Sequence, residues 1–132
     1  MKTAAILIAR LIFGGVFLMG AAFKFWLMGI DATAAEIAGA GFPIPTVLAW
    51  VAAFFELGLA FAFLTGFYFS EAAVVTIAYV LFLAFSFHGP DKFAGNPMEF
   101  GFFVDHFVFV AGLLFAAVHG PGRVLVLRWR PI

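Results

Sequence analysis

Four long apolar runs, separated by shorter polar or turn-rich segments, constrain the fold of this chain more than any other feature of its sequence. A helix needs about 20 apolar residues to cross the hydrocarbon core of a bilayer. The predicted spans are residues 3–28, 47–66, 71–87 and 100–119. Of the 132 residues, 66% are hydrophobic and 11% are charged, which is more apolar surface than a water-soluble core can bury. The sequence therefore predicts an all-α integral membrane four-helix bundle, forming one domain over residues 1–132.

The connections between the spans predict the topology. Residues 31–46 are too polar and too rich in Gly and Pro to cross a membrane, and residues 32–38 are expected to form a short helix at the membrane interface. Residues 88–99 form a second long loop, whereas residues 67–70 leave room for a tight turn alone. Basic residues gather near the chain ends, and this bias predicts that both termini lie in the cytoplasm. These residues are Lys2, Arg123, Arg128 and Arg130.

Composition excludes two classes of function. The net charge is zero and the seven basic residues form no dense cluster, so the chain lacks the basic surface of a nucleic-acid-binding protein. The chain contains no cysteine, which excludes disulfide bonds, thiolate metal sites and thiol redox chemistry carried by this chain. A redox role would therefore require a bound cofactor or a partner.

Ionisable and polar side chains inside the predicted spans define the candidate site. A charge within a bilayer is costly, so such groups pair with one another or line a polar cavity. At a rise of 1.5 Å per residue, several of them fall in the outer half of the predicted bundle. This candidate ligand cluster consists of Lys24, Glu56, Tyr79, Asp105 and His106. We expect Lys24 to point inward, to Glu56 or to Asp105.

Two interpretations of Lys24 and Glu56 stay open on the sequence. In the structural interpretation, a buried pair fixes the register of two helices, or Lys24 extends to the lipid headgroups. In the functional interpretation, the pair lines a pocket where a quinone carbonyl, or another small polar group, accepts a hydrogen bond from Lys24. Glu56, removed from water, could then carry protons.

The histidines do not indicate a metal centre. His88 with His106 is the one axial pair that the helix positions would allow, and we do not expect a haem. A loop site built from His88, Asp91 and Glu99 lacks a fixed ligand spacing. We therefore expect no resident metal, and the sequence assigns no catalytic residue.

Small residues predict close helix packing in the first and last spans. One face of the first span carries residues spaced four and three apart. They are Arg10, Gly14, Phe17, Ala21 and Lys24. The last span has a small-xxx-small row of Gly112, Ala116 and Gly120. Arg10 lies about two turns inside its span, and we expect its side chain to extend to lipid phosphates, with a packing role as well.

Three segments resemble the DoxX family of membrane proteins. The segment "ARLIFGGVFLMGAAFKF" (9–25) resembles the family's first helix, "FFELGLAFAFLTGF" (54–67) its second, and "VHGPGR" (118–123) the segment that follows its last helix. The packing positions that the resemblance marks are Arg10, Gly14, Gly20, Gly58, Gly120, Gly122 and Arg123, and it carries over Lys24 and Glu56 as well. The Phe-rich fourth span, with Asp105 and His106, departs from the family pattern, as does the polar loop before it.

The resemblance implies a four-helix protein of the bacterial inner membrane, of the kind associated with thiosulfate-to-quinone electron transfer or with redox-stress complexes. The expected function is a small subunit of a redox or quinone-associated membrane assembly, not catalytic by itself, with quinone as ligand and other membrane subunits as partners. One alternative is a structural subunit of a larger respiratory or photosynthetic complex, which would use the 21 phenylalanines for docking. A small-solute transporter is the other alternative. The fold alone does not decide among them.

Overall fold

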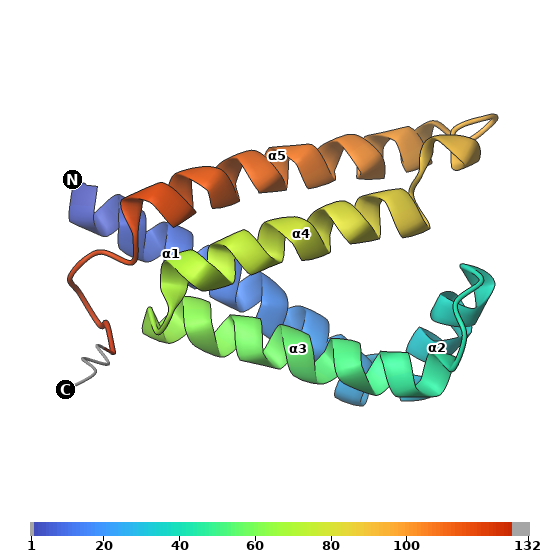
Figure 1. Ribbon diagram of the computed structural model, residues 1–132, viewed down its shortest axis with the longest axis horizontal. Coiled ribbons are helices and arrows are strands. Elements are labelled where there is room, and N and C mark those ends of the chain that lie inside the picture. Colours follow the sequence, from blue (N-terminus) through green and yellow to red (C-terminus); the bar gives the residue numbers. More distant parts are fainter. Residues whose placement is uncertain (1, 128–132) are drawn as a thin grey trace. The chain divides into compact units, whose positions relative to one another are not determined.

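The computed structural model of the protein describes residues 2–127, and the described part of the chain contains helices and no strand. The elements are α1 (Lys2–Ala22), the π-helical turn η1 (Phe23–Leu27), α2 (Ile30–Gly39), α3 (Pro45–Thr65), α4 (Phe69–Phe87), the 3₁₀ turn η2 (Pro90–Lys92) and α5 (Pro97–His119) (Figure 1). Arg128 and Arg130, which the topology prediction used, lie outside the described residues.

Four helical segments are long and apolar enough to cross a membrane, and they match the four predicted spans. They are Lys2–Leu27, Pro45–Thr65, Phe69–Lys92 and Pro97–His119. When η1 is counted with α1, the helices α1, α3, α4 and α5 begin and end within three residues of the predicted boundaries, and α2 contains the predicted short helix. The third candidate span also includes the loop as far as Lys92, five residues beyond the predicted end. The bundle arrangement, the cytoplasmic termini, the single domain and the interfacial position of α2 stay predictions.

Prolines and glycines set the helix boundaries. Pro45 and Pro97 occupy the first turns of α3 and α5, where a missing backbone N–H costs nothing. Gly66 ends α3 in the left-handed conformation, with a φ of 72°, which a glycine adopts without strain. Gly120, also with a φ of 72°, ends α5.

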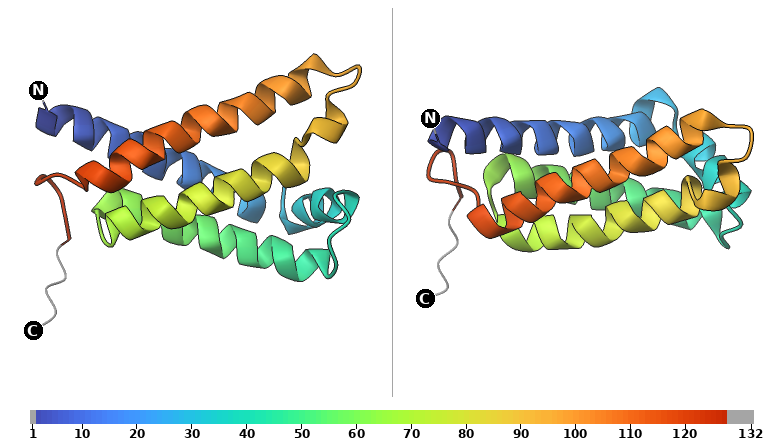
Figure 2. Two further views of the ribbon diagram at one scale, coloured as in Figure 1. Left: turned by 45° about the horizontal axis from the view of Figure 1, so that its top comes forward. Right: turned by 90° about the horizontal axis from the view of Figure 1, so that it is seen from above.

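The chain divides into two compact units, and the first contains residues 2–68 together with residues 121–127 of the described chain. In this unit α1 packs along α3, and α2 contacts α3 (Figure 2). Phe63 of α3 is fully buried, and its ring lies 5.5 Å from the ring of Phe13 and 5.8 Å from that of Phe17. The buried face of α1 includes Arg10, Gly14, Phe17 and Ala21, which confirms the predicted stripe.

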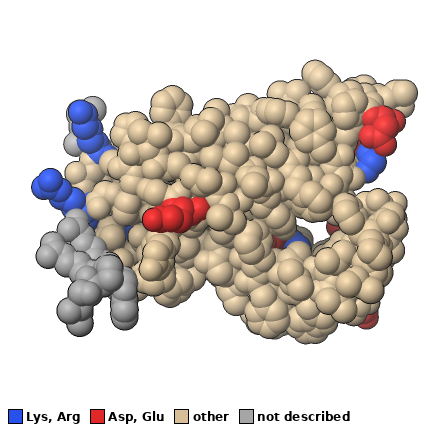
Figure 3. Space-filling view, viewed as in Figure 1, with Lys and Arg blue, Asp and Glu red and all other residues tan. Residues whose placement is uncertain are grey.

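The second unit, residues 69–120, is an antiparallel hairpin of α4 and α5 joined by the loop that contains η2 (Figure 2). Phe85 of α4 packs edge-on against Phe103 of α5, with ring centroids 5.2 Å apart. Leu113 is the one buried residue of α5, so α4 leaves most of this Phe-rich helix uncovered within the second unit. The face of the molecule in Figure 3 carries few charged side chains, as expected for helices that contact lipid.

Candidate functional site

Lys24 and Glu56 form an ion pair between the end of the first span and the middle of α3. Lys24 Nζ lies 2.8 Å from Glu56 Oε2, a distance at which the ammonium group donates a charge-assisted hydrogen bond to the carboxylate. The Glu56 side chain is 7% exposed and that of Lys24 is 21% exposed. The predicted inward orientation of Lys24 toward Glu56 is therefore confirmed.

The pair stands at a change in helix geometry. Lys24 is the second residue of η1, where the N–H of Met28 donates to the carbonyl oxygen of Phe23, five residues earlier, over 2.8 Å. Single π turns inside α-helices are rare and frequently occur at functional sites. The stripe of α1 thus runs regularly up to Lys24, and the helix changes its winding around that residue.

Gly20 provides the space for the Glu56 carboxylate. A Cβ atom on Gly20 would lie 2.6 Å from Glu56 Oε2, which is far inside ordinary contact distance. Because Gly20 precedes Lys24 by four residues, it stands on the same side of the helix one turn earlier. Gly20 was predicted as a packing residue, and the structure shows that the group it accommodates belongs to the ion pair.

Arg10 holds the opposite end of this unit together. Its side chain is 1% exposed, and all five of its N–H groups donate to backbone carbonyl oxygens. Two acceptors, Phe63 and Leu64, lie in the last turn of α3, at distances of 3.2 and 2.7 Å. The other acceptors, at 2.7–3.1 Å, are Pro121, Val124 and Leu125. The prediction that Arg10 extends to lipid phosphates is therefore wrong, because no N–H group is left for a phosphate.

This arrangement explains the guanidinium as a helix cap. The last carbonyl groups of a helix have no intrahelical partner, and they carry the negative end of the helix dipole. A buried cation with five donors satisfies two of them in α3 and three more in the returning chain. Leu127 adds a backbone hydrogen bond of 2.8 Å to the carbonyl oxygen of Thr65, so residues 121–127 lie against the end of α3.

The remaining positions of the predicted packing motif differ in what they contact. A Cβ on Gly14 would lie 2.5 Å from Leu64, and one on Gly122, which has a φ of 79°, would lie 3.1 Å from Ile6. Both glycines therefore permit close contacts. Gly58 does not make the contact that its place in the motif predicts, because no described atom lies within 4 Å of the position of its Cβ. Arg123 is exposed, in agreement with an interfacial anchor, which stays a prediction.

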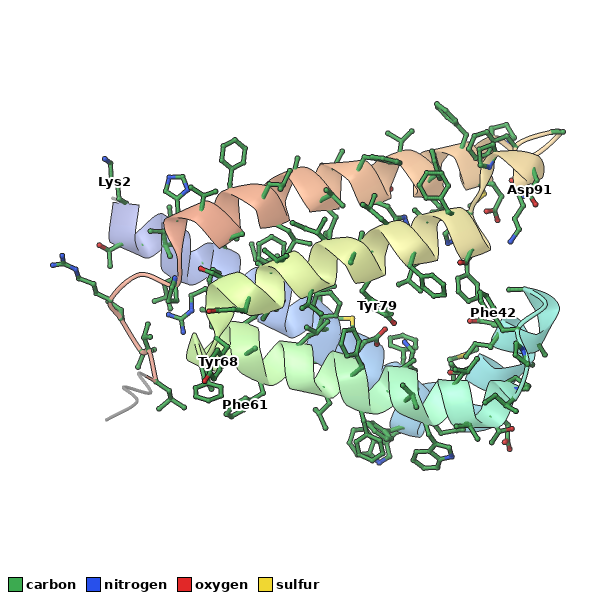
Figure 4. The ribbon with its side chains drawn as sticks, viewed as in Figure 1. Lys2, Phe42, Phe61, Tyr68, Tyr79 and Asp91 are labelled. Carbon is green, nitrogen blue, oxygen red and sulfur yellow. The ribbon has the colours of Figure 1, made fainter. Side chains whose placement is uncertain are left out.

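The other members of the predicted cluster belong to the second unit. Tyr79 is half-buried on α4, from which it projects in Figure 4, and Asp105 is exposed on α5. His106 Nδ1 lies 2.6 Å from the carbonyl oxygen of Phe102, which can only accept, so this nitrogen carries the proton. The grouping of these three residues with Lys24 and Glu56 stays a prediction.

The loop after α4 contains a second polar contact. His88 Nδ1 lies 2.7 Å from Glu99 Oε2, and the His88 ring lies 5.4 Å from the ring of His106. Asp91 belongs to η2 and is labelled in Figure 4. Within residues 2–127, no three His, Asp or Glu side chains are grouped so that they could hold a metal ion.

Sequence reasoning missed an aromatic cluster next to Lys24. The ring of Phe25 lies within 6.0 Å of three neighbouring aromatic rings, those of Trp26, Trp50 and Phe54. Trp26 is 80% exposed and Trp50 46% exposed. Tryptophan gathers at the ends of membrane spans, where its ring meets both lipid and water. The positions of Trp26 and Trp50 near the ends of two spans were the available signal.

Comparison with known proteins supports one family. The sequence model described as DoxX matches residues 5–89, which is 85 of the 132 residues and more than half of the chain. The match includes Arg10, Lys24 and Glu56, while the "VHGPGR" segment lies beyond it. No curated protein and no solved structure matches the chain.

Proposed function

Because this chain belongs to the DoxX family of small membrane proteins, we propose that it is a subunit of a redox assembly that binds a quinone beside the Lys24–Glu56 pair. The proposed location is the bacterial inner membrane, with both termini in the cytoplasm. The role is accessory or co-catalytic, since the chain has no cysteine and electrons would come from a partner. The observation that carries the proposal is the unequal exposure of the two paired side chains, 21% for Lys24 and 7% for Glu56.

Because Lys24 is more exposed than Glu56, the N–H donors of its ammonium group stay accessible while the Glu56 carboxylate is covered. An ammonium group has three N–H donors, and within the described residues Lys24 uses them for Glu56 alone. The remaining donors suit an acceptor such as the carbonyl oxygen of a quinone. Glu56 orients the ammonium group in an apolar setting, which strengthens the hydrogen bond to an incoming ligand.

The aromatic cluster supports the same ligand. Phe25 follows Lys24 directly, and its ring lies 6.0 Å from Trp50 and 5.2 Å from Phe54. A quinone combines a flat ring with polar carbonyl oxygens, and aromatic side chains pack favourably against flat rings. Lys24 would thus bind the carbonyl edge of the quinone, and the rings of Phe25, Trp50 and Phe54 would lie close to the quinone ring.

Titration with a short-chain quinone in detergent tests the proposal, with quenching of tryptophan fluorescence as the readout. The test variant is the double substitution Lys24→Met with Glu56→Gln, which removes both charges and leaves no unpaired buried ion. We expect saturable quenching for the wild type and at least a tenfold weaker affinity for the double variant. The matched control is Lys2→Met with Glu71→Gln, because both of these residues are exposed and lie outside the site. Equal affinities for all three proteins would contradict the proposal.

A structural subunit of a larger membrane complex is the second candidate, and the single buried residue of α5 favours it. In that case the ion pair fixes α1 against α3 and binds no ligand. The same titration separates the two candidates. A structural subunit would show no saturable quenching in any variant, while the double variant would be less stable than its control.

A further inference from the structure

Asp105 is an ionisable side chain exposed in the interior of a membrane span. It follows Pro97, the first residue of α5, by eight residues, and it precedes His119, the last, by fourteen. At 1.5 Å per residue these separations are about 12 and about 21 Å. Asp105 is exposed and makes no hydrogen bond or ion pair within residues 2–127. A carboxylate at such a depth normally has a partner, and it marks a functional position when the chain itself supplies none.

The described basic residues of this chain do not supply that partner. Arg10 uses all five of its donors on backbone carbonyls. Lys24 is paired with Glu56, and Lys92 donates to the carbonyl oxygen of Phe87 over 2.7 Å. The other described basic residues lie at the start of the first span or after the last. Within residues 2–127, no basic side chain therefore pairs with Asp105.

The surface around Asp105 allows another helix to approach closely. At 100° per residue, Gly101, Asp105 and Val108 lie within about 60° of one another on α5. We call these three residues the Asp105 stripe. Val108 is 68% exposed, and no described atom lies within 4 Å of the position of a Cβ on Gly101. Small residues permit close contact between membrane helices.

The Asp105 stripe also faces away from the hairpin partner of α5. Phe103 contacts Phe85 of α4, and two residues along a helix correspond to a rotation of about 200°. Asp105 therefore lies on a different side of α5 from the ring of Phe103 that contacts α4.

We propose that the Asp105 stripe is a docking face for a transmembrane helix of a different protein, and that this helix carries a Lys or Arg at the depth of Asp105. Charge complementarity identifies the occupant. A second copy would have the same orientation in the membrane, so its Asp105 would meet the first at equal depth, and two like charges in contact oppose association. The inference rests on the part of the proposed function that makes this chain a subunit of an assembly, and it is independent of quinone binding.

Site-specific photo-crosslinking in the native membrane tests this inference. A photoreactive phenylalanine analogue replaces Val108 in one protein and Leu114 in the control. Leu114 is 54% exposed, and it lies about 180° around α5 from Asp105 and about 14 Å further along the helix. We expect the Val108 probe to crosslink to a transmembrane peptide of another protein with a Lys or Arg within one turn of the crosslinked residue. The Leu114 probe should not produce that adduct.

Charge substitution completes the test. Asp105→Lys should reduce the Val108 adduct at least tenfold, and exchanging the partner's basic residue for Asp should restore it. Adducts with lipid alone, with a second copy alone, or with a helix that lacks a basic residue at that depth would overturn the inference. Quinone titration of Asp105→Lys keeps the two proposals distinguishable. If Asp105→Lys loses the adduct and binds quinone with unchanged affinity, docking and ligand binding are separate properties. If the Val108 probe forms the adduct in a protein that binds no quinone, the ligand site is refuted and the docking face is not.

Discussion

Substitution of Gly20 by alanine has two opposite effects on stability, a gain in helix propensity and a loss of the Lys24–Glu56 pair, and their sizes can be compared. Alanine is favoured over glycine in a helix interior by about 1 kcal/mol. At Gly20 the added Cβ would lie 2.6 Å from Glu56 Oε2, while ordinary contacts begin at 3.4 Å, so the carboxylate must move by about 0.8 Å. Such a shift would lengthen the hydrogen bond of 2.8 Å to Lys24 toward about 3.6 Å, which is outside hydrogen-bonding distance.

The loss of the pair is expected to exceed the gain in helix propensity. Breaking a buried ion pair by removal of one partner costs about 3–5 kcal/mol, and a displaced pair that is partly exposed should lose about half of that. After subtraction of the gain in helix propensity, we expect Gly20→Ala to destabilise the protein by about 0.5–1.5 kcal/mol and to weaken quinone binding.

Gly15→Ala provides a matched control in the same helix. No described atom lies within 4 Å of the position of a Cβ on Gly15, so the same substitution should leave stability unchanged or raise it by up to about 1 kcal/mol. Reversible unfolding in mixed micelles measures both variants. If Gly20→Ala were as stable as Gly15→Ala and bound quinone equally well, the assigned role of Gly20 would be wrong.

Four further substitutions test the described contacts by the same unfolding measurement. Arg10→Met removes five hydrogen bonds, which at about 0.6 kcal/mol each in a membrane protein should cost about 3 kcal/mol. Arg10→Lys should recover less than half of this, because an ammonium group has three donors and no planar fork, and full recovery would contradict the capping role. Glu99→Gln should cost at most about 1 kcal/mol, since the pair with His88 is partly exposed, and a larger loss would show that the contact is underestimated. Gly66→Ala should destabilise by more than 1 kcal/mol, because the φ of 72° strains alanine and the new Cβ would lie 3.0 Å from Pro121, and an unchanged midpoint would contradict this packing.

The spans and the ion pair could be predicted from the sequence for direct physical reasons. Within lipid, a long apolar run satisfies the hydrogen bonds of its backbone N–H and C=O groups by forming a helix. Prolines and glycines mark the ends of these helices. Lys24 and Glu56 are opposite charges in neighbouring spans, each costly alone. Their pairing follows from that cost, and the structure confirms it.

The partners of Arg10 could not be predicted in the same way. Its acceptors are backbone carbonyls, and every residue has one, so the sequence carries no mark of which are used. Two of them belong to the last turn of α3 and three to a segment more than 110 residues away. A charged residue inside a span predicts a side chain that extends to lipid phosphates and also packs, whereas the carbonyl groups at a helix end are an equally strong acceptor.

The π turn at Lys24 left no signal in the sequence either. The residues of η1, "FKFWL", are compatible with a continuous α-helix, and the helical stripe that ends at Lys24 indicates one. The turn contacts α2 and α3, and such tertiary contacts leave no mark in the composition. Gly20 was placed correctly as a close-contact residue, but its contact with a carboxylate required the structure.

The central claim is that the Lys24–Glu56 pair binds a quinone in a subunit of a membrane assembly. Native mass spectrometry of the protein, released from its own membranes in mild detergent, tests it most directly. We expect the wild type to carry the mass of one quinone, and the double variant Lys24→Met with Glu56→Gln to retain its protein partners without that mass. A wild-type protein released with its partners and no quinone would contradict the claim and leave the pair with a structural role.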